Sequence, residues 1–245
     1  MMEPLVITAY LRCGVISDPW LPLDGLLLYE MCRRENGGPA DASMPGLGSA
    51  LALAGKVPPS PLALVRDGCY QYHACSFAHW GLPCEEGRDH WNKRFDASLV
   101  DLLDARYRRI DTGSGRYRSY HMPVFYRVAP WVRWYAVGNR DAVRSLLERV
   151  PALGKKRVHG WGRVTRWEVE RVECDRSLIV DGVPQRSIPV TPQSRRIVRD
   201  ATVMVWGFRP PYYEPGGQAE CFMPPGPMYD TQSGMSGWNG GGNAA

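Results

Sequence analysis

Long apolar runs are absent from the 245-residue chain, and this absence sets the first limits on its function. No stretch approaches the roughly 18 uncharged apolar residues that a membrane-spanning helix needs. The N-terminal residues contain no basic segment followed by a long apolar one, so no secretion signal is indicated. The seven cysteines are odd in number and scattered, which favours a reducing compartment over a disulfide framework. We therefore expect a cytoplasmic protein that does not enter a membrane.

Lysine is scarce, because only four of the 30 basic residues are Lys and the others are Arg. The net charge of +5 hides an uneven distribution: residues 106–166 hold fifteen basic side chains against three acidic ones. Tyr, Trp and Phe are interleaved with these arginines. Guanidinium groups make bidentate contacts with phosphate, and unpaired bases stack on aromatic rings. The block therefore predicts a face that binds a polyanion, with single-stranded RNA favoured.

The order of the strand and helix patterns favours an α+β fold. It fits a ferredoxin-like, RRM-type βαββαβ core with an antiparallel sheet and β-hairpin insertions. We expect one elaborated domain over residues 1–209, a flexible insertion at 36–61, and a Gly- and Pro-rich, disordered tail over 210–245. The predicted strands are 5–11, 62–65, 70–76, 124–128, 131–137, 164–172 and 202–208, with a further hairpin within 178–190, and the predicted helices are 25–34 and 141–150.

Two loops in the basic block carry the residue types that contact RNA. Residues 111–123 combine Gly and Ser with Arg and Tyr, and residues 153–164 combine three glycines with four cationic side chains and a Trp. Glycines let backbone N–H groups approach phosphate closely. The second loop is neither a Walker A loop nor a dinucleotide fingerprint, and the alternative is a flexible basic connection between helix and strand. The candidate RNA-binding residues are Arg116, Tyr117, Arg118, Tyr120, His121, Gly154, Lys155, Lys156, Arg157, His159, Gly160, Trp161, Gly162 and Arg163.

The Gly-x5-Gly-aromatic-Gly pattern of residues 154–162 resembles the glycine-rich loop of the RAMP superfamily, the repeat-associated proteins of CRISPR-Cas systems. Residues 92–96, 112–123 and 153–164 look like the pattern of one RAMP type, the subunit of type IV (Csf) effector complexes that binds the 5′ handle of the guide RNA. The resemblance runs from about residue 5 to residue 172.

This resemblance implies a non-catalytic role in a ribonucleoprotein of antiviral and antiplasmid defence. The subunit would grip the 5′ handle of the guide RNA (crRNA), cap the filament of backbone subunits and help to dock the large subunit. The implied partners are the crRNA and those two kinds of subunit, and a contact with target DNA is left open. The resemblance implies no cofactor.

The competing hypothesis is a metal-independent endoribonuclease that processes CRISPR repeat RNA, because related RAMP proteins have that activity. Such a reaction needs a base for a 2′-hydroxyl and an acid for the 5′-oxygen, and histidine titrates near neutral pH. His121 and His159 lie in the two basic loops and are the candidate pair. The alternative is that the same side chains donate hydrogen bonds to RNA or belong to the fold.

Two further groups of residues are assigned to the fold and not to function. The His and Cys residues between 69 and 90 lack the paired C-x2-C spacing of zinc sites, so we expect no metal. These residues are Cys69, His73, Cys75, His79, Cys84 and His90. Tryptophans outside the two loops are expected in the core or at subunit interfaces. They are Trp20, Trp80, Trp91, Trp167 and Trp206.

Overall fold

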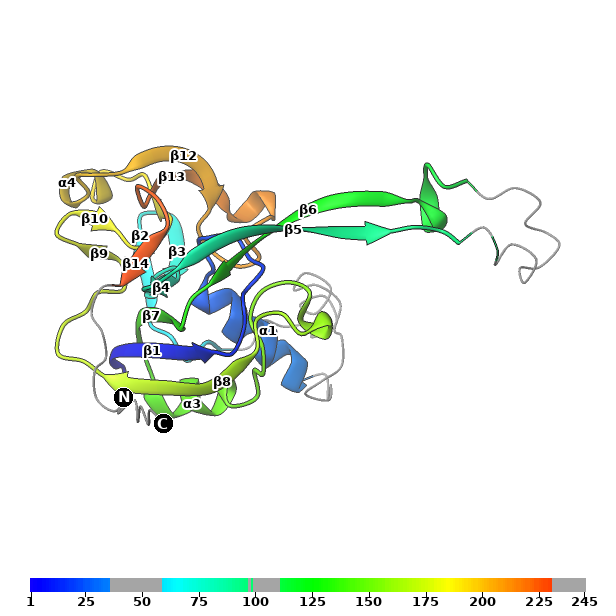
Figure 1. Ribbon diagram of the computed structural model, residues 1–245. Coiled ribbons are helices and arrows are strands. Elements are labelled where there is room, and N and C mark those ends of the chain that lie inside the picture. Colours follow the sequence, from blue (N-terminus) through cyan, green and yellow to red (C-terminus); the bar gives the residue numbers. More distant parts are fainter. Residues whose placement is uncertain (36–58, 97, 99–110, 231–245) are drawn as a thin grey trace, which may run out of the picture.

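A five-stranded sheet forms the centre of the computed structural model, with the strand order β14-β4-β7-β1-β8 (Figure 1). The structure describes residues 1–35, 59–96, 98 and 111–230. The central strand β1 (Glu3–Leu11) is antiparallel to β7 (Trp131–Gly138) on one side and to β8 (Val164–Arg171) on the other. β4 (His79–Gly81) is antiparallel to β7, and β14 (Met228–Asp230) is parallel to β4, so the sheet is mixed and not wholly antiparallel as the sequence predicted.

Two helices pack with this sheet and complete the main core. α1 (Leu23–Glu35) follows β1 in the chain, and α3 (Arg140–Leu147) connects β7 to β8. α3 begins at Asn139, whose side-chain oxygen accepts a hydrogen bond from the Ala142 amide at 3.0 Å and so satisfies one of the amides that the first turn leaves unpaired. Alternate residues of β1 point to the same side, which places its apolar residues against the helices. The buried residues of this core include Leu5, Ile7, Leu27, Met31, Val132, Trp134, Val143 and Leu147.

A second, smaller apolar cluster forms where the C-terminal strands pack on the hairpin of β2 and β3. Gly68 forms the turn of that hairpin with a φ of 60°, as the Asp-Gly sequence predicts. β13 lies between β11 and β12 in a separate three-stranded sheet. The elements of this part are β2 (Leu64–Asp67), β3 (Tyr70–His73), β9 (Ile179–Val180), β10 (Val183–Pro184), β11 (Ile188–Pro189), α4 (Ser194–Ile197), β12 (Thr202–Gly207), η4 (Pro215–Gly217) and β13 (Gln218–Met223). Its buried side chains are Tyr72, Phe77, Ile188, Phe208, Cys221 and Met223.

A fully buried arginine connects the two cores. Arg186 donates hydrogen bonds to the carbonyl oxygens of His73 at 2.6 Å and Phe208 at 2.7 Å and to the Tyr212 hydroxyl at 2.9 Å. Its guanidinium also lies 3.4 Å from the Asp24 carboxylate at the start of α1. Burial alone would raise the pKa of Asp24, but the Arg186 charge, His73 and the hydrogen bond from the Tyr212 hydroxyl together outweigh it and lower this pKa to about 2. Losing either partner would leave a buried charge unpaired, which costs about 3–5 kcal/mol.

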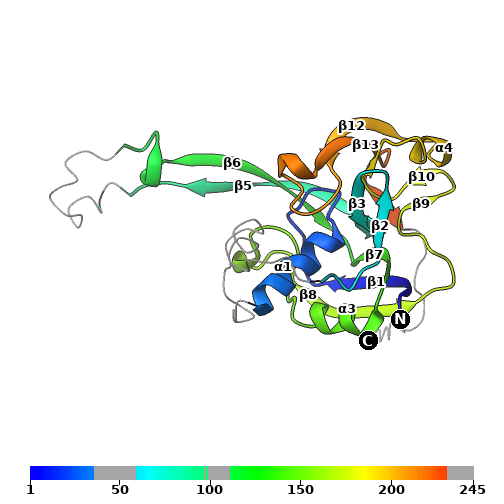
Figure 2. The same ribbon diagram turned by 180° about the vertical axis from the view of Figure 1, so that it is seen from behind.

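A long two-stranded hairpin projects away from both cores (Figures 1 and 2). Its strands are β5 (Glu85–Lys93) and β6 (Tyr120–Val128), which pair over nine residues each. The 3-10 turn η2 (Gly115–Tyr117) lies at its far end, where the rings of Phe95 and Tyr117 meet with centroids 5.1 Å apart.

Each predicted strand and both predicted helices correspond to an element of the structure, although β3 ends at His73 and α3 at Leu147. Three features of the sequence interpretation need correction. The loop predicted over 111–123 is shorter, because β6 already begins at Tyr120. The tail predicted from residue 210 is folded through residue 230, since β13 and β14 belong to it and β14 joins the central sheet. β4 and β5 were not predicted as strands.

Two further expectations are addressed only in part by the described residues. Most of the insertion predicted at 36–61 lies outside those residues, since 36–58 are not among them. Across the described part of the chain, none of the helices is both long enough and apolar enough to cross a membrane.

Candidate nucleic-acid interface

The glycine-rich loop (residues 151–163) is fixed by backbone hydrogen bonds to the segment that follows β1. The Gly162 amide donates to the Gly14 carbonyl oxygen at 2.8 Å, and the Lys155 amide donates to the Ile16 carbonyl oxygen at 2.7 Å. The loop is therefore not the flexible connection that the sequence left open as an alternative. Its short 3-10 turn is η3 (Arg157–His159).

Two glycines of the loop are required by close packing. Gly154 has a φ of 72° and Gly162 a φ of 69°, values that side chains with a Cβ rarely adopt. A Cβ on Gly154 would collide with the carbonyl oxygen of Ile16, and one on Gly162 with that of Leu153. These glycines therefore let the loop pack closely on the protein itself.

The backbone amides of the loop correct part of the sequence interpretation. Lys155, His159, Gly160 and Gly162 use their N–H groups in hydrogen bonds to backbone carbonyls of the protein. The expectation that loop amides hold phosphates is therefore wrong for these four positions.

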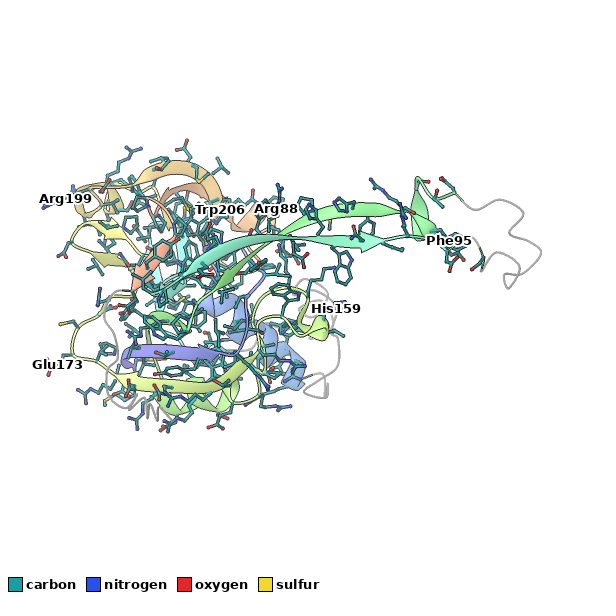
Figure 3. All side chains as sticks on the ribbon, in the orientation of Figure 1. Arg88, Phe95, His159, Glu173, Arg199 and Trp206 are labelled. Atoms are coloured by element: carbon teal, nitrogen blue, oxygen red, sulfur yellow. The ribbon has the colours of Figure 1, made fainter. Side chains whose placement is uncertain are left out.

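The hairpin meets the loop at Trp91 of β5. The Lys156 ammonium nitrogen lies 3.7 Å from the centroid of the Trp91 ring, and the His159 ring centroid lies 4.4 Å from it. The Trp91 indole nitrogen donates a hydrogen bond to the Tyr120 hydroxyl at 3.2 Å. Lys156 is itself in the left-handed region, with a φ of 58°, which is uncommon for a residue with a side chain. Figure 3 shows His159 beside the hairpin.

Two more pairs combine loop residues with aromatic rings. The rings of Trp161 and Tyr126 have centroids 5.0 Å apart and join the loop to β6. The Arg157 guanidinium carbon lies 5.3 Å from the ring centroid of Tyr29 on α1. Together with the Trp91 contacts, these pairs place residues of the loop against aromatic rings of the hairpin and of α1. Such a surface can hold phosphates by charge and bases by stacking.

A pocket of about 250 Å³ lies between β6 and the loop. Residues 122–125 of β6 line one side, Lys155 and Lys156 another, and residues 16–18 the rest. The Lys155 ammonium lies 3.7 Å from the Asp18 carboxylate, and both side chains are exposed, so water screens this ion pair. The volume lies just below the range of about 300–1,000 Å³ typical of small-molecule pockets.

The outer face of the hairpin carries a pair of histidines. The rings of His90 and His121 stack with centroids 4.3 Å apart, and His121 Nδ1 forms a hydrogen bond with Asn92 Oδ1. Side chains alternate between the two faces of a strand, so His90 and Asn92 point away from the face that holds Trp91. His159 contacts Trp91, and His121 therefore lies on the opposite face of the hairpin from His159. The structure does not bring the candidate acid–base pair together.

A family model described as CRISPR type IV associated protein Csf3 matches residues 85–224, which is more than half of the chain. The chain belongs to this family. The matched region begins with β5 and contains the hairpin, the glycine-rich loop and β8 to β13. No curated protein is significantly similar to the chain.

The basic block does not form one continuous face in this Csf3 family member. Arg140 and Arg144 lie on α3, which the ribbon places away from the hairpin (Figure 1). Arg133 forms an ion pair with Asp230 at 2.6 Å. The prediction of a single face is therefore wrong. Residues that are close in sequence here lie on a strand, a helix and a loop, and their side chains point in different directions. Arg106, Arg108 and Arg109 lie outside the described residues.

The candidate residues of the first loop divide between two places. Tyr120 and His121 lie in β6 near Trp91, whereas Arg116, Tyr117 and Arg118 lie at or next to η2, at the far end of the hairpin. Figure 3 labels Phe95, the ring partner of Tyr117, at that far end. The second set, from Gly154 to Arg163, stays together in the glycine-rich loop. The far end of the hairpin and the loop therefore hold two separate sets of candidate residues.

Sequence reasoning missed three residues that contact the loop: Trp91, Tyr126 and Tyr29. Trp91 was assigned to the core or to a subunit interface, but it contacts Lys156 and His159 of the loop. The polar sequence of β5 gave no alternation of apolar residues, so it did not predict a strand.

The histidines and cysteines considered for a metal do not gather into a site in the described part of the chain. In those residues no group of three or more His, Cys, Asp or Glu side chains has a geometry that could hold a metal ion. Cys75 is buried beside Arg186, with its sulfur 3.3 Å from the guanidinium. His79 packs edge-on against the Tyr135 ring with centroids 5.1 Å apart.

Proposed function

We propose that this Csf3 family protein is the non-catalytic subunit of a type IV CRISPR ribonucleoprotein that grips the 5′ handle of the guide RNA. The grip lies between the glycine-rich loop and the Trp91 face of the β5–β6 hairpin. The observation that carries this proposal is the contact of Lys156 and His159 with Trp91, which joins the basic loop to the aromatic hairpin. Belonging to the Csf3 family supports the CRISPR context.

Single-stranded RNA is the favoured ligand because of the kinds of side chain that meet here. Lys155, Lys156, Arg157 and Arg163 supply the charge for phosphates, and Trp91, Tyr120, Tyr126 and Trp161 supply ring faces for bases. A duplex would hide its bases from these rings.

The proposal includes a ferredoxin-like core of the RAMP type. The strands β1, β4, β7 and β8 follow the chain order of a βαββαβ unit when α1 and α3 are included. Their order in the sheet, β4-β7-β1-β8, and their antiparallel pairing support this assignment.

The non-catalytic role is supported by the separation of the two candidate histidines. His159 faces Trp91, and His121 lies on the other face of the hairpin, so one phosphate cannot lie between the two rings. The projecting hairpin supports a role at the end of the backbone filament, where it can reach a neighbouring subunit. The large subunit is the other protein partner in this proposal.

The test compares a guide RNA with the same RNA lacking its 5′ handle, each labelled and titrated with purified protein. The handle should raise the affinity by about tenfold, which corresponds to about 1.4 kcal/mol. Equal affinity for the two RNAs would contradict recognition of the handle. Binding of neither RNA would contradict the RNA-binding role itself.

A further inference from the structure

The strand β12 presents an edge that no described strand covers. It is the last strand in the order β11-β13-β12, and all six of its residues pair with β13 on one side. Within residues 1–35, 59–96, 98 and 111–230, no strand pairs with its other side. Figures 1 and 2 both show β12 at the outer margin of the molecule. Its outward N–H and C=O groups can therefore pair with another extended chain.

The side chains of β12 lack the charges that usually protect such an edge. Its sequence from Thr202 to Gly207 contains no charged residue. Val203 and Val205 are 48% and 64% exposed and, two positions apart, point to the same face. By contrast, the edge strand β8 of the central sheet carries Arg166, Glu168, Glu170 and Arg171. Natural proteins use such charges to prevent unwanted strand pairing, and β12 lacks them.

Arginines stand at both ends of this apolar strand. Arg195, Arg196 and Arg199 precede it, the first two on α4, and Arg209 follows it, and all four are exposed. The acidic residues nearby include Asp200 beside Arg199, Asp181 next to Gly182, which packs on the Arg199 side chain, and Glu220 of β13, which pairs with Val205. Residues 195–209 therefore have four positive charges and one negative charge. Apolar and acidic side chains would complement this surface.

We propose that β12 is a docking site for an extended, acidic segment of another protein, which adds a strand to the β11-β13-β12 sheet. The bound segment would alternate apolar side chains, which cover Val203 and Val205, with acidic ones, which reach Arg199 and Arg209. When a peptide adds a strand to a sheet edge, backbone hydrogen bonds supply the affinity, and the outer edge of β12 would supply them here. This surface is separate from the RNA interface.

Two other occupants fit the same surface less well. RNA would find aliphatic side chains on the strand face instead of rings on which bases stack. A second copy of this chain would bring arginines against arginines in either strand direction, because β12 has them at both ends. An acidic protein segment avoids both mismatches.

The experiment measures fluorescence anisotropy of a labelled peptide of about eight residues, long enough to span the strand, that alternates valine with glutamate. Purified full-length protein should bind it saturably. Replacing glutamate with lysine in the peptide should weaken binding by about tenfold, and N-methylation of alternate peptide amides should abolish it. The double variant Val203→Asp/Val205→Asp should lose binding, since both side chains are exposed and the variant should fold.

Leu64→Asp is the matched control, because Leu64 is an aliphatic residue of β2 that is 49% exposed. This variant should bind the peptide as the wild type does. Absence of saturable binding to the wild type, or equal binding of the glutamate and lysine peptides, would overturn the proposal.

Two parallel measurements separate the other occupants. A guide RNA should bind the double variant and the wild type equally, and weaker RNA binding by the double variant would assign the surface to RNA. In sedimentation, the wild type and the double variant should have the same oligomeric state. Self-association of the wild type that the double variant loses would assign the surface to a second copy. If the wild type failed to bind RNA, the proposed function would be contradicted. The peptide measurement would still decide whether β12 is a docking site.

Discussion

The ammonium nitrogen of Lys156 lies 3.7 Å from the ring centroid of Trp91, and this contact joins two parts of the chain that are distant in sequence. Lys156 belongs to a loop held by backbone hydrogen bonds, and Trp91 belongs to the projecting hairpin. A cation over an indole ring is attracted by the ring's electron density. The contact therefore holds the outer half of β5 against the loop and places a positive charge over an aromatic ring.

Trp91 is expected to contribute a stacking contact to RNA. Trp91→Ala should weaken binding of single-stranded repeat RNA by about tenfold or more, because stacking on a ring is worth about 1–3 kcal/mol per base. Trp91→Phe, which keeps a ring, should retain most of the affinity. Val158→Ala is the control, since Val158 lies in the same loop with a side chain that is 79% exposed. Unchanged binding by Trp91→Ala in a filter-binding titration would show that the Trp91 ring does not contact the RNA.

The loop cations should determine how binding depends on salt. If the interface neutralises about five phosphates of a single strand, log K should fall against log salt with a slope near −3.5. The variant Lys155→Ala/Lys156→Ala/Arg157→Ala should flatten that slope by about two. The control Arg140→Ala/Arg144→Ala removes two charges from α3 and should leave the slope almost unchanged. If the slope changed in the α3 variant and not in the loop variant, the RNA-binding surface would lie on the α3 side of the molecule and not at the loop.

Gly162 should be needed for folding of the loop. In Gly162→Ala the new Cβ would meet the Leu153 carbonyl oxygen at a residue with a φ of 69°, so the variant should lose about 3 kcal/mol or more of unfolding free energy. Gly160→Ala is the matched control. Its φ of 92° is also unfavourable, but a Cβ there would meet no atom within 4 Å, so the expected loss is about 1–2 kcal/mol. Urea unfolding measures both, and equal losses would contradict the packing argument.

His79 should make the protein less stable in mild acid. Burial lowers the pKa of His79 to about 4, from 6.5 in its unperturbed state. As the pH falls from about 6.5 to about 4, His79 binds a proton in the unfolded chain but stays neutral in the folded chain. The folded state therefore loses stability in that pH range. His79→Phe should lose about 2 kcal/mol less than the wild type between about pH 7.5 and pH 5 in urea unfolding. The same loss in both proteins would show that another group is responsible.

The periodic segments of the fold could be predicted from the sequence, and the hairpin could not. β1, α1, α3 and β8 have apolar residues at regular spacing, because each packs one side against the core. β5 has both faces largely exposed, so its sequence has no apolar alternation. β14 lies in a Pro- and Gly-rich stretch, and it is a strand because it pairs with β4.

The candidate site could be predicted in part. The glycine-rich loop was identified from its glycines and cations, but two of those glycines serve packing against Ile16 and Leu153. The role of Trp91 depends on a contact between the loop and a hairpin that the sequence did not predict. The opposite orientations of His121 and His159 follow from the register of β5 and β6, which only the structure supplies.

The most direct test of the account is to incubate the purified protein with labelled cognate repeat RNA in EDTA and to follow retention and strand length on one gel. The account predicts retained RNA of unchanged length, with retention reduced in Trp91→Ala and Lys156→Ala. A discrete shorter product that disappears in His121→Ala or His159→Ala would contradict it and identify a metal-independent nuclease.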